Sequence, residues 1–175
     1  MKFTALELPG SYIIEREDLV DNRGFFARTF CREEWSRKGI DFEIKQCNVS
    51  WSKKQGTLRG LHFQKPPHAE IKLISCLKGA IWDCIVDVRP DSPTYRRHFG
   101  MELSAFGKML YIPEGFAHGF QSLEDDSVVE YKVSTFYAPE AEAGLRWDDP
   151  KLRIAWPSCQ NRTISDKDAN WALLD

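Results

Sequence analysis

Two apolar runs on either side of a glycine-containing pair are the strongest structural signal in this chain. Residues 71–77 (IKLISCL) and 80–88 (AIWDCIVDV) flank Lys78 and Gly79. Apolar runs around a two-residue turn with glycine predict a β-hairpin. Side chains alternate along a strand, so Lys72 is expected on the opposite face from its immediate neighbours. On this pattern alone, Lys72 is equally a strand-edge lysine or a functional one.

Further short strands are predicted along the chain, and glycine and proline clusters separate them: 100–103, 108–112, 120–122 and 127–134. Residues 12–30 read as strand, turn and strand. Helical signals are sparse, with one short helix predicted over 32–38 and a second over 166–174 with Ser165 as its N-cap. Many short, evenly spaced strands are typical of a β-sandwich or barrel. No repeat or linker interrupts the 175 residues, so we expect a single domain over 1–175.

Charge and cysteine usage narrow the functional classes. The net charge of −2 argues against general nucleic-acid binding. No apolar run approaches the roughly 20 residues that a membrane span needs, and the first residues show no apolar signal core. The five cysteines are scattered without a C-x-x-C pair, which argues against a disulfide framework. A reduced, cytoplasmic location is the expected one.

Two histidine-containing segments hold the candidate chemistry. Residues 58–64 (LRGLHFQ) contain His62, and residues 111–120 (YIPEGFAHGF) contain His118 in a P-x-G-x-x-H spacing. That spacing resembles the second histidine motif of the cupin barrels. Metal-binding cupins carry H-x-H in their first motif, whereas this chain has Gln64 in place of the second histidine. A first-row metal needs three or more convergent ligands, so we expect no metal.

A series of blocks then resembles one family, the dTDP-4-dehydrorhamnose 3,5-epimerases, from about residue 21 to residue 168. The blocks, in order, are DNRGFF (21–26), QCN (46–48), GTLRGLHFQ (56–64), KL (72–73), VDVRPDSPT (86–94), YIPEGFAHGF (111–120), the strand that contains Tyr131, YAPEAE (137–142), WDDP (147–150) and ISDKD (164–168). The resemblance implies a mainly β, cupin-type jelly-roll barrel with a few short peripheral helices. It also implies an isomerase that acts as a homodimer on a nucleotide sugar, without a cofactor, in deoxysugar synthesis of the rhamnose or O-antigen (lipopolysaccharide) type.

The same resemblance implies four catalytic side chains. The reaction removes a proton from carbon beside the C4 ketone of a 4-keto-6-deoxyhexose and returns a proton to the other face. His62 is similar to the base of the family, and its ordinary pKa near 6.5 suits that task. Asp168 would fix the imidazole, and Lys72 would stabilise the enolate oxygen. Tyr131 would donate the proton.

Substrate-binding residues follow from the resemblance in the same way. Three basic side chains would bind the diphosphate through charge-assisted hydrogen bonds: Arg23, Arg59 and Lys167. Three polar side chains would line the sugar end: Gln46, Asn48 and His118. Tyr137 would stack on the nucleobase, and Glu142 would contact the nucleotide.

Two departures from the family pattern lie near where the substrate enters. Arg28 stands where the family often has glutamate, which makes it a further substrate-binding candidate. Residues 67–70 (PHAE) replace a stretch that commonly contains a neutral glutamine, so Glu70 differs as well. These departures leave the nucleobase and the sugar open.

Several alternatives stay open at this point. The enzyme could act at C3 or C5 only, or on a CDP-sugar. A metal-dependent cupin and a non-catalytic sugar-nucleotide-binding barrel are further classes. Taken singly, His62 could be a structural histidine and Asp168 a first-turn helix acid. Only the combination of His62 with Lys72, Tyr131 and Asp168 favours an epimerase.

Overall fold

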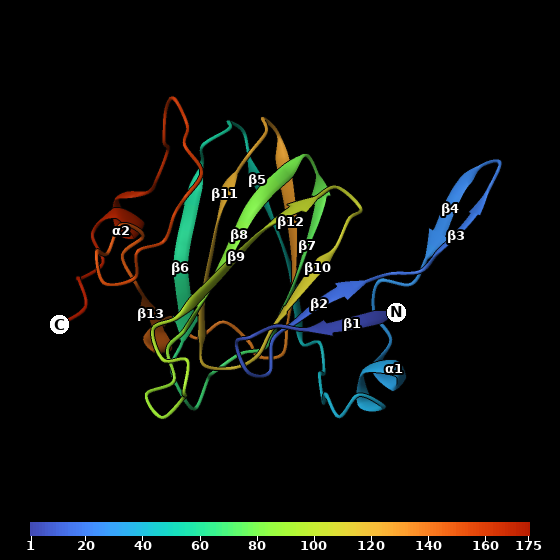
Figure 1. The fold of residues 1–175 in the computed structure, drawn as a ribbon, viewed down its shortest axis with the longest axis horizontal. Helices are drawn as coiled ribbons and strands as arrows, with labels where there is room; N and C mark the ends of the chain where they lie inside the picture. Colours follow the sequence, from blue (N-terminus) through green and yellow to red (C-terminus); the bar gives the residue numbers. More distant parts are fainter.

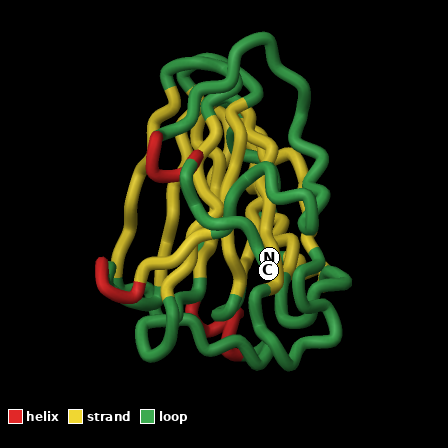
Figure 2. Tube along the Cα trace, turned by 90° about the vertical axis from the view of Figure 1, so that its left-hand side faces the viewer, coloured by secondary structure: helices red, strands yellow, loops and turns green.

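The computed structural model describes residues 1–175 and is mainly β-structure. A six-stranded antiparallel sheet has the order β1 (Lys2–Ala5), β2 (Tyr12–Glu15), β10 (Met109–Ile112), β7 (Lys72–Lys78), β12 (Ser127–Val133), β5 (Gln46–Ser52). A five-stranded sheet has the order β13 (Glu142–Gly144), β6 (Leu58–Gln64), β11 (Phe116–Ser122), β8 (Ala80–Asp87), β9 (His98–Ser104). The two sheets face each other as the layers of one barrel, with loops gathered at both ends (Figures 1 and 2).

The hairpin predicted from residues 71–88 is wrong in its pairing. Both strands form, but β7 and β8 belong to different sheets, and the chain crosses between the layers at Lys78 and Gly79. Gly79 has a φ of +71°, and a Cβ there would lie 2.7 Å from the Ser127 hydroxyl. Both runs are buried along most of their length, and their inner faces pack against one another in a shared core. Hydrophobicity alone therefore identified the strands but not their partners.

Apolar side chains from both sheets fill the barrel interior. This core includes Ile74 of β7, Ile85 of β8, Phe120 of β11 and Val129 of β12. Lys72 lies two residues before Ile74 and shares its inward face. Leu73 instead packs with Trp35 and Phe42 outside the six-stranded sheet, so the predicted separation of Lys72 from its neighbours is confirmed. Lys72 therefore faces the interior between the two sheets.

Helices are short and peripheral, as expected. Helix α1 (Arg32–Ser36) packs Trp35 against the outside of the six-stranded sheet. Helix α2 (Asp166–Ala169) begins at Ser165, whose hydroxyl accepts a hydrogen bond from the Asp168 N–H at 3.2 Å. The cap is confirmed, but the helix ends five residues before the predicted limit. A 3₁₀ turn, η1 (Pro139–Ala141), precedes β13. Neither helix has the length and hydrophobicity to cross a membrane.

Residues 12–30 contain one more strand than predicted, and the last two form a separate hairpin. Strands β3 (Asp18–Asp21) and β4 (Gly24–Ala27) pair only with each other. Figure 1 shows this hairpin, which we call the arm, projecting away from the barrel. Leu19, Val20 and Phe26 on the arm are 69%, 77% and 72% exposed. The arm therefore presents apolar side chains that nothing in this chain covers.

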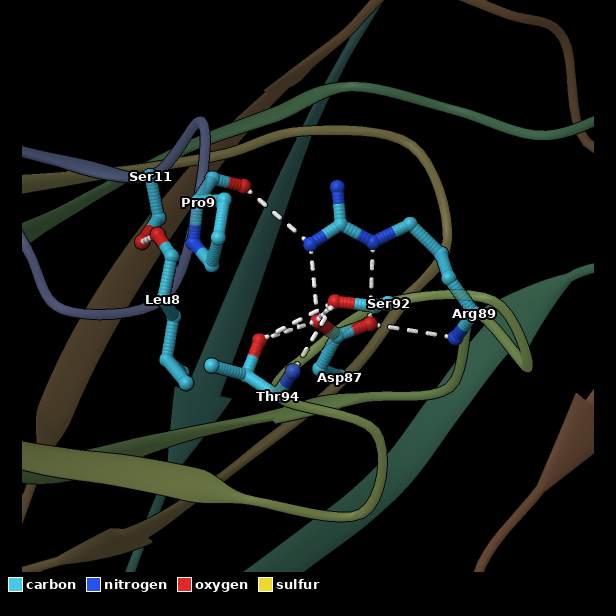
Figure 3. Close-up of polar contacts among 7 residues, drawn as sticks. All are labelled: Leu8, Pro9, Ser11, Asp87, Arg89, Ser92 and Thr94. Carbon is cyan, nitrogen blue, oxygen red and sulfur yellow. Dashed lines mark hydrogen bonds and ion pairs between the residues drawn. The ribbon is translucent and has the colours of Figure 1, made fainter.

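The buried carboxylate of Asp87 accepts hydrogen bonds from several residues of the loop that follows β8 (Figure 3). The Asp87 side chain is fully buried and accepts hydrogen bonds from Arg89 Nη2 at 2.7 Å, Ser92 Oγ at 2.6 Å and Thr94 Oγ1 at 2.6 Å. Arg89 also donates to the Pro9 carbonyl at 3.1 Å. Burial raises the pKa of Asp87, but these hydrogen bonds outweigh it and hold the pKa well below its usual value. The VDVRPDSPT block therefore stabilises this loop through the hydrogen bonds of Asp87.

Candidate active site

A cavity of about 380 Å³ lies between the two sheets and contains most of the predicted site. It is lined by Gln46, Asn48, His62, Phe63, Gln64, Glu70, Lys72, Tyr131, Val133, Thr135, Tyr137 and Glu142. Gln46, Asn48, Lys72 and Tyr131 lie on strands of the six-stranded sheet, whereas His62 lies on β6 of the other. The barrel thus brings residues from distant parts of the sequence to one cavity.

The His62 imidazole contacts the carboxylate of Asp168, which does not itself line the cavity. Its Nε2 lies 2.6 Å from Asp168 Oδ1, and Asp168 Oδ2 accepts the Gly60 N–H at 3.0 Å. The Asp168 side chain is 6% exposed and that of His62 is 34% exposed. Burial raises the pKa of Asp168, but the hydrogen bonds from His62 and Gly60 outweigh it and lower the pKa below its usual value. An ionised Asp168 leaves Nδ1 of His62 as the basic nitrogen.

Gly60 allows β6 to approach β11 closely at this point. A Cβ on Gly60 would lie 2.6 Å from both the Gly119 Cα and the His118 carbonyl oxygen. Its φ of +104° is also a conformation that other residues rarely adopt. The pairing register between β6 and β11 shifts between His118 and Phe120, at this close approach. The glycine between Arg59 and Leu61 therefore positions the N–H that holds Asp168.

Lys72 enters the cavity from the first residue of β7. Its Nζ lies 3.1 Å from Glu70 Oε1 and 3.4 Å from the carbonyl oxygen of His62. The side chain is 10% exposed, so the ammonium is largely removed from water. A desolvated ammonium stabilises nearby anionic charge more strongly than an exposed one.

Tyr131 reaches the cavity from β12, in the sheet that faces His62. Burial and the nearby Asp83 carboxylate raise the pKa of Tyr131 well above its usual value near 10. The phenol therefore stays protonated at neutral pH. Its ring packs edge-on against the His118 ring, with 5.8 Å between centroids.

His118 lies beneath the cavity and not on its wall. It is 4% exposed, and its Nε2 is 2.8 Å from Asp83 Oδ2. Asp83 is fully buried, and its other carboxylate oxygen has no hydrogen-bond partner. Sequence reasoning missed Asp83, because the residue lies inside an apolar run whose pattern predicts only a strand. The predicted contact between His118 and the sugar stays a prediction.

The rim of the cavity is polar and interconnected. Glu142 accepts hydrogen bonds from Lys167 Nζ at 2.6 Å and from the Tyr137 hydroxyl at 2.9 Å. Burial raises the pKa of Glu142, but these two partners lower it below its usual value overall. Gln46 Nε2 donates to Asn48 Oδ1 at 2.9 Å. Tyr137 is 57% exposed, so its ring is open for stacking at the mouth.

The Gln64 side chain forms hydrogen bonds with two loops beside the cavity. Its amide nitrogen donates to the His68 carbonyl at 2.9 Å and the Phe136 carbonyl at 3.3 Å, and its amide oxygen accepts the Ala138 N–H at 2.7 Å. Gln64 is 4% exposed, and these three bonds use its donors and its acceptor. The position of the second cupin histidine is therefore occupied by a structural amide. No group of three or more His, Cys, Asp or Glu side chains is arranged to hold a metal ion.

A model of the family described as dTDP-4-dehydrorhamnose 3,5-epimerase matches residues 5–175. The chain belongs to this family. A dTDP-4-dehydrorhamnose 3,5-epimerase of Sinorhizobium fredii is 44% identical to it over 176 residues, which cover 99% of this chain and 90% of the relative. The chain is therefore an isomerase of the epimerase type, as predicted.

Solved structures of a dTDP-4-dehydrorhamnose 3,5-epimerase and of a 3′-monoepimerase share the fold. The enzyme from Bacillus anthracis, solved with TDP and pyrophosphate bound, has a TM-score of 0.95 and 40% identity over 99% of both chains. A 3′-monoepimerase from Streptomyces bikiniensis, solved with dTDP-quinovose, has a TM-score of 0.90 and 35% identity over 96% of this chain and 85% of that one. The predicted cupin-type barrel is confirmed.

Three arginines predicted for the family's substrate site do not line the cavity in this epimerase chain. Arg59 is exposed and donates to the Trp51 carbonyl at 3.0 Å. Together with Asp168 it lines a second pocket, which His62 does not line. Arg23 lies at the tip of the arm and pairs with Asp21, and Arg28 pairs with Glu34 at 2.7 Å. Their roles stay predictions.

Several cavity residues were not predicted from the family resemblance: Phe63, Gln64, Val133 and Thr135, with Glu70 noted only as a departure. Strand alternation would have found some of them. Gln64 lies two residues after His62, and Val133 lies two residues after Tyr131, so each pair shares a face.

Proposed function

We propose that this chain epimerises a nucleotide-linked 4-keto-6-deoxyhexose at C3 and C5, converting dTDP-4-dehydro-6-deoxy-D-glucose to dTDP-4-dehydro-L-rhamnose. The observation that carries the proposal is the convergence of His62, Lys72 and Tyr131 on one cavity. His62 comes from one sheet, and the other two come from the facing sheet. A base and an acid on facing walls are what inversion at carbon requires.

The proposed chemistry begins at His62. Nδ1 takes the proton from the carbon next to the C4 ketone, and the electron pair moves onto the ketone oxygen to form an enolate. Asp168 stabilises the resulting imidazolium through Nε2. The Lys72 ammonium stabilises the enolate oxygen. Tyr131 then gives its phenolic proton to the same carbon from the opposite face, which inverts the centre.

The nucleotide would occupy the mouth of the cavity. Tyr137 is exposed there and would stack on the base, while Lys167 would meet the diphosphate. The relatives with TDP or a dTDP-sugar bound support thymine as the base. The pathway, the synthesis of rhamnose for surface polysaccharide, is part of this proposal.

Solvent deuterium uptake tests the reaction. The protein is incubated with dTDP-4-keto-6-deoxyglucose in D₂O, and C3 and C5 are followed by NMR. Uptake at both carbons is expected, together with its loss in His62→Ala. Near-normal uptake in His62→Ala would show that the mechanism is wrong.

A 3-only epimerase is the second candidate, supported by the similarity to the 3′-monoepimerase. The same NMR experiment separates the two, because this candidate predicts deuterium at C3 alone. No uptake at either carbon would refute both, and the CDP-linked sugar would be tested next.

The proposal includes a homodimer in which the arm of one copy completes the cavity of the other. Arg23 at the tip of the arm and Arg28 directly after the arm are basic, as a diphosphate site requires. Neither arginine, and no other residue of the arm, lines the cavity of its own chain. Three exposed apolar side chains on the arm would be covered by a second copy. Exchange of such an element between identical chains is a common route to dimers.

Complementation between two inactive variants tests the shared site. Arg23→Ala and His62→Ala are each expected to be nearly inactive as homodimers. Mixed dimers, formed by co-expression, would contain one cavity with an intact His62 and an intact arm from the partner. Activity recovered in mixed dimers supports the arrangement, and a monomeric mass by light scattering would refute it.

A further inference from the structure

Glu70 shares the cavity wall with Lys72 and is its nearest charged partner. The two residues lie two positions apart, and Glu70 Oε1 is 3.1 Å from Lys72 Nζ. The side chains are 14% and 10% exposed, so water competes weakly for this contact. Neither the charge nor the position of Glu70 is used by the proton transfers proposed above.

The backbone around Glu70 is held rigidly against the segment that follows β12. The Ile71 N–H donates to Ser134 Oγ at 2.8 Å, and the Ser134 N–H donates to the Ile71 carbonyl at 3.1 Å. On the other side of Glu70, Thr135 Oγ1 donates to the Ala69 carbonyl at 3.1 Å. A carboxylate on a segment tied at both flanking residues has a defined place relative to the start of β7.

Two oxygen atoms of the protein lie near the Lys72 ammonium, which carries three N–H donors. Glu70 Oε1 forms an ion pair with Nζ at 3.1 Å, and the carbonyl oxygen of His62 accepts a hydrogen bond from Nζ at 3.4 Å. These two contacts fix the position of the ammonium in the cavity. A lysine side chain otherwise has several rotatable bonds and no preferred direction for its charge.

We infer that Glu70 is a positioning residue: its ion pair holds the Lys72 ammonium where its charge reaches the enolate oxygen. The inference rests on the proposed function, because it assigns Glu70 a place in the same reaction. A carboxylate beside the ammonium also offsets part of the positive charge offered to the enolate. The benefit of Glu70 is therefore in placing the ammonium, and a neutral oxygen at the same place should serve as well.

Three variants separate this role from a general effect on the cavity. Glu70→Ala removes the oxygen beside Nζ, and Glu70→Gln keeps an oxygen there without the charge. Glu140→Ala is the matched control, because Glu140 is an exposed acid on η1 near the same loops. Glu70→Ala is expected to lower kcat about tenfold to a hundredfold with KM changed less than about twofold. Glu70→Gln and Glu140→Ala should stay within about threefold of the wild type.

A double variant tests whether Glu70 acts through Lys72. In a Lys72→Ala background, followed in single-turnover assays, Glu70→Ala should add less than about a twofold loss. A full additional loss, or an equal loss in Glu70→Gln and Glu70→Ala, would overturn the positioning role, because Glu70 would then act on the substrate or through its charge.

A measurement without substrate separates this inference from the proposed reaction. NMR relaxation of the Lys72 side-chain methylene next to Nζ reports its order in the free protein. The order should fall in Glu70→Ala and stay near the wild-type value in Glu70→Gln. Unchanged order in Glu70→Ala overturns the positioning role. Absence of deuterium uptake by the wild type refutes only the reaction.

Discussion

His62 Nε2 lies 2.6 Å from Asp168 Oδ1, and this contact joins residues that are 106 positions apart in the sequence. Local structure at both ends aligns the two side chains. Gly60 lets its own N–H reach the second oxygen of Asp168, and Ser165 begins the short helix that carries the carboxylate. The alignment therefore depends on a glycine and a helix cap as well as on the pair itself.

Asp168→Asn is predicted to lower kcat by at least about a hundredfold, because an amide in place of the carboxylate no longer stabilises the imidazolium. The folded state should persist, since the substituted side chain has the same shape. Steady-state epimerisation measures the loss. Asp166→Asn is the matched control on the same helix, because Asp166 is exposed and its side chain makes no hydrogen bond. Equal losses in the two variants would contradict a special role for Asp168.

Tyr131→Phe is predicted to separate solvent exchange from inversion. The proposed base on the facing sheet remains, so His62 can still remove a proton and return a deuteron to the same face. The inverted product requires the phenol and should fall by about a hundredfold or more. NMR in D₂O with chiral analysis of C3 and C5 distinguishes retained from inverted deuterated sugar. Inverted product at the wild-type rate would exclude Tyr131 as the acid.

The sequence predicted the strands of this fold better than their partners. Residues 71–88 are apolar enough to be buried on both faces, so their pattern carried no information on which strand lies beside which. Alternation still placed Lys72 correctly, because the two-residue period holds whichever sheet the strand joins.

The candidate site was predicted through the family resemblance and not through spacing. His62, Lys72, Tyr131 and Asp168 meet because the barrel closes, and no local pattern encodes that closure. Asp83 was missed because a single acid within an apolar strand carries no signal until its neighbours are known. The arm residue Arg23 was predicted for the same cavity, but in this chain it lies at the tip of the arm and pairs with Asp21.

Gln64→Ala is predicted to lower the free energy of unfolding by about 1–3 kcal/mol, because the buried Ala138 N–H loses its acceptor. The loop that carries Tyr137 should loosen as well, so KM should rise more than kcat falls. Thermal denaturation and steady-state kinetics measure the two effects. Gln160→Ala is the control, since Gln160 is exposed. Unchanged stability in Gln64→Ala would show that its hydrogen bonds to the loops do not stabilise the fold.

Asp87→Asn is predicted to destabilise the protein by about 3 kcal/mol at neutral pH, and the difference from the wild type should vanish in acid. The hydrogen bonds from Arg89 and its neighbours hold the pKa of Asp87 below the ordinary 3.8. The unfolded chain therefore binds the proton first as the pH falls, so the contribution of Asp87 is complete above about pH 4 and is lost below it. Urea unfolding at several pH values checks this. Asp91→Asn, at an exposed position in the same loop, should leave stability unchanged. A difference between wild type and Asp87→Asn that stays constant down to pH 2 would show that its cause is packing and not charge.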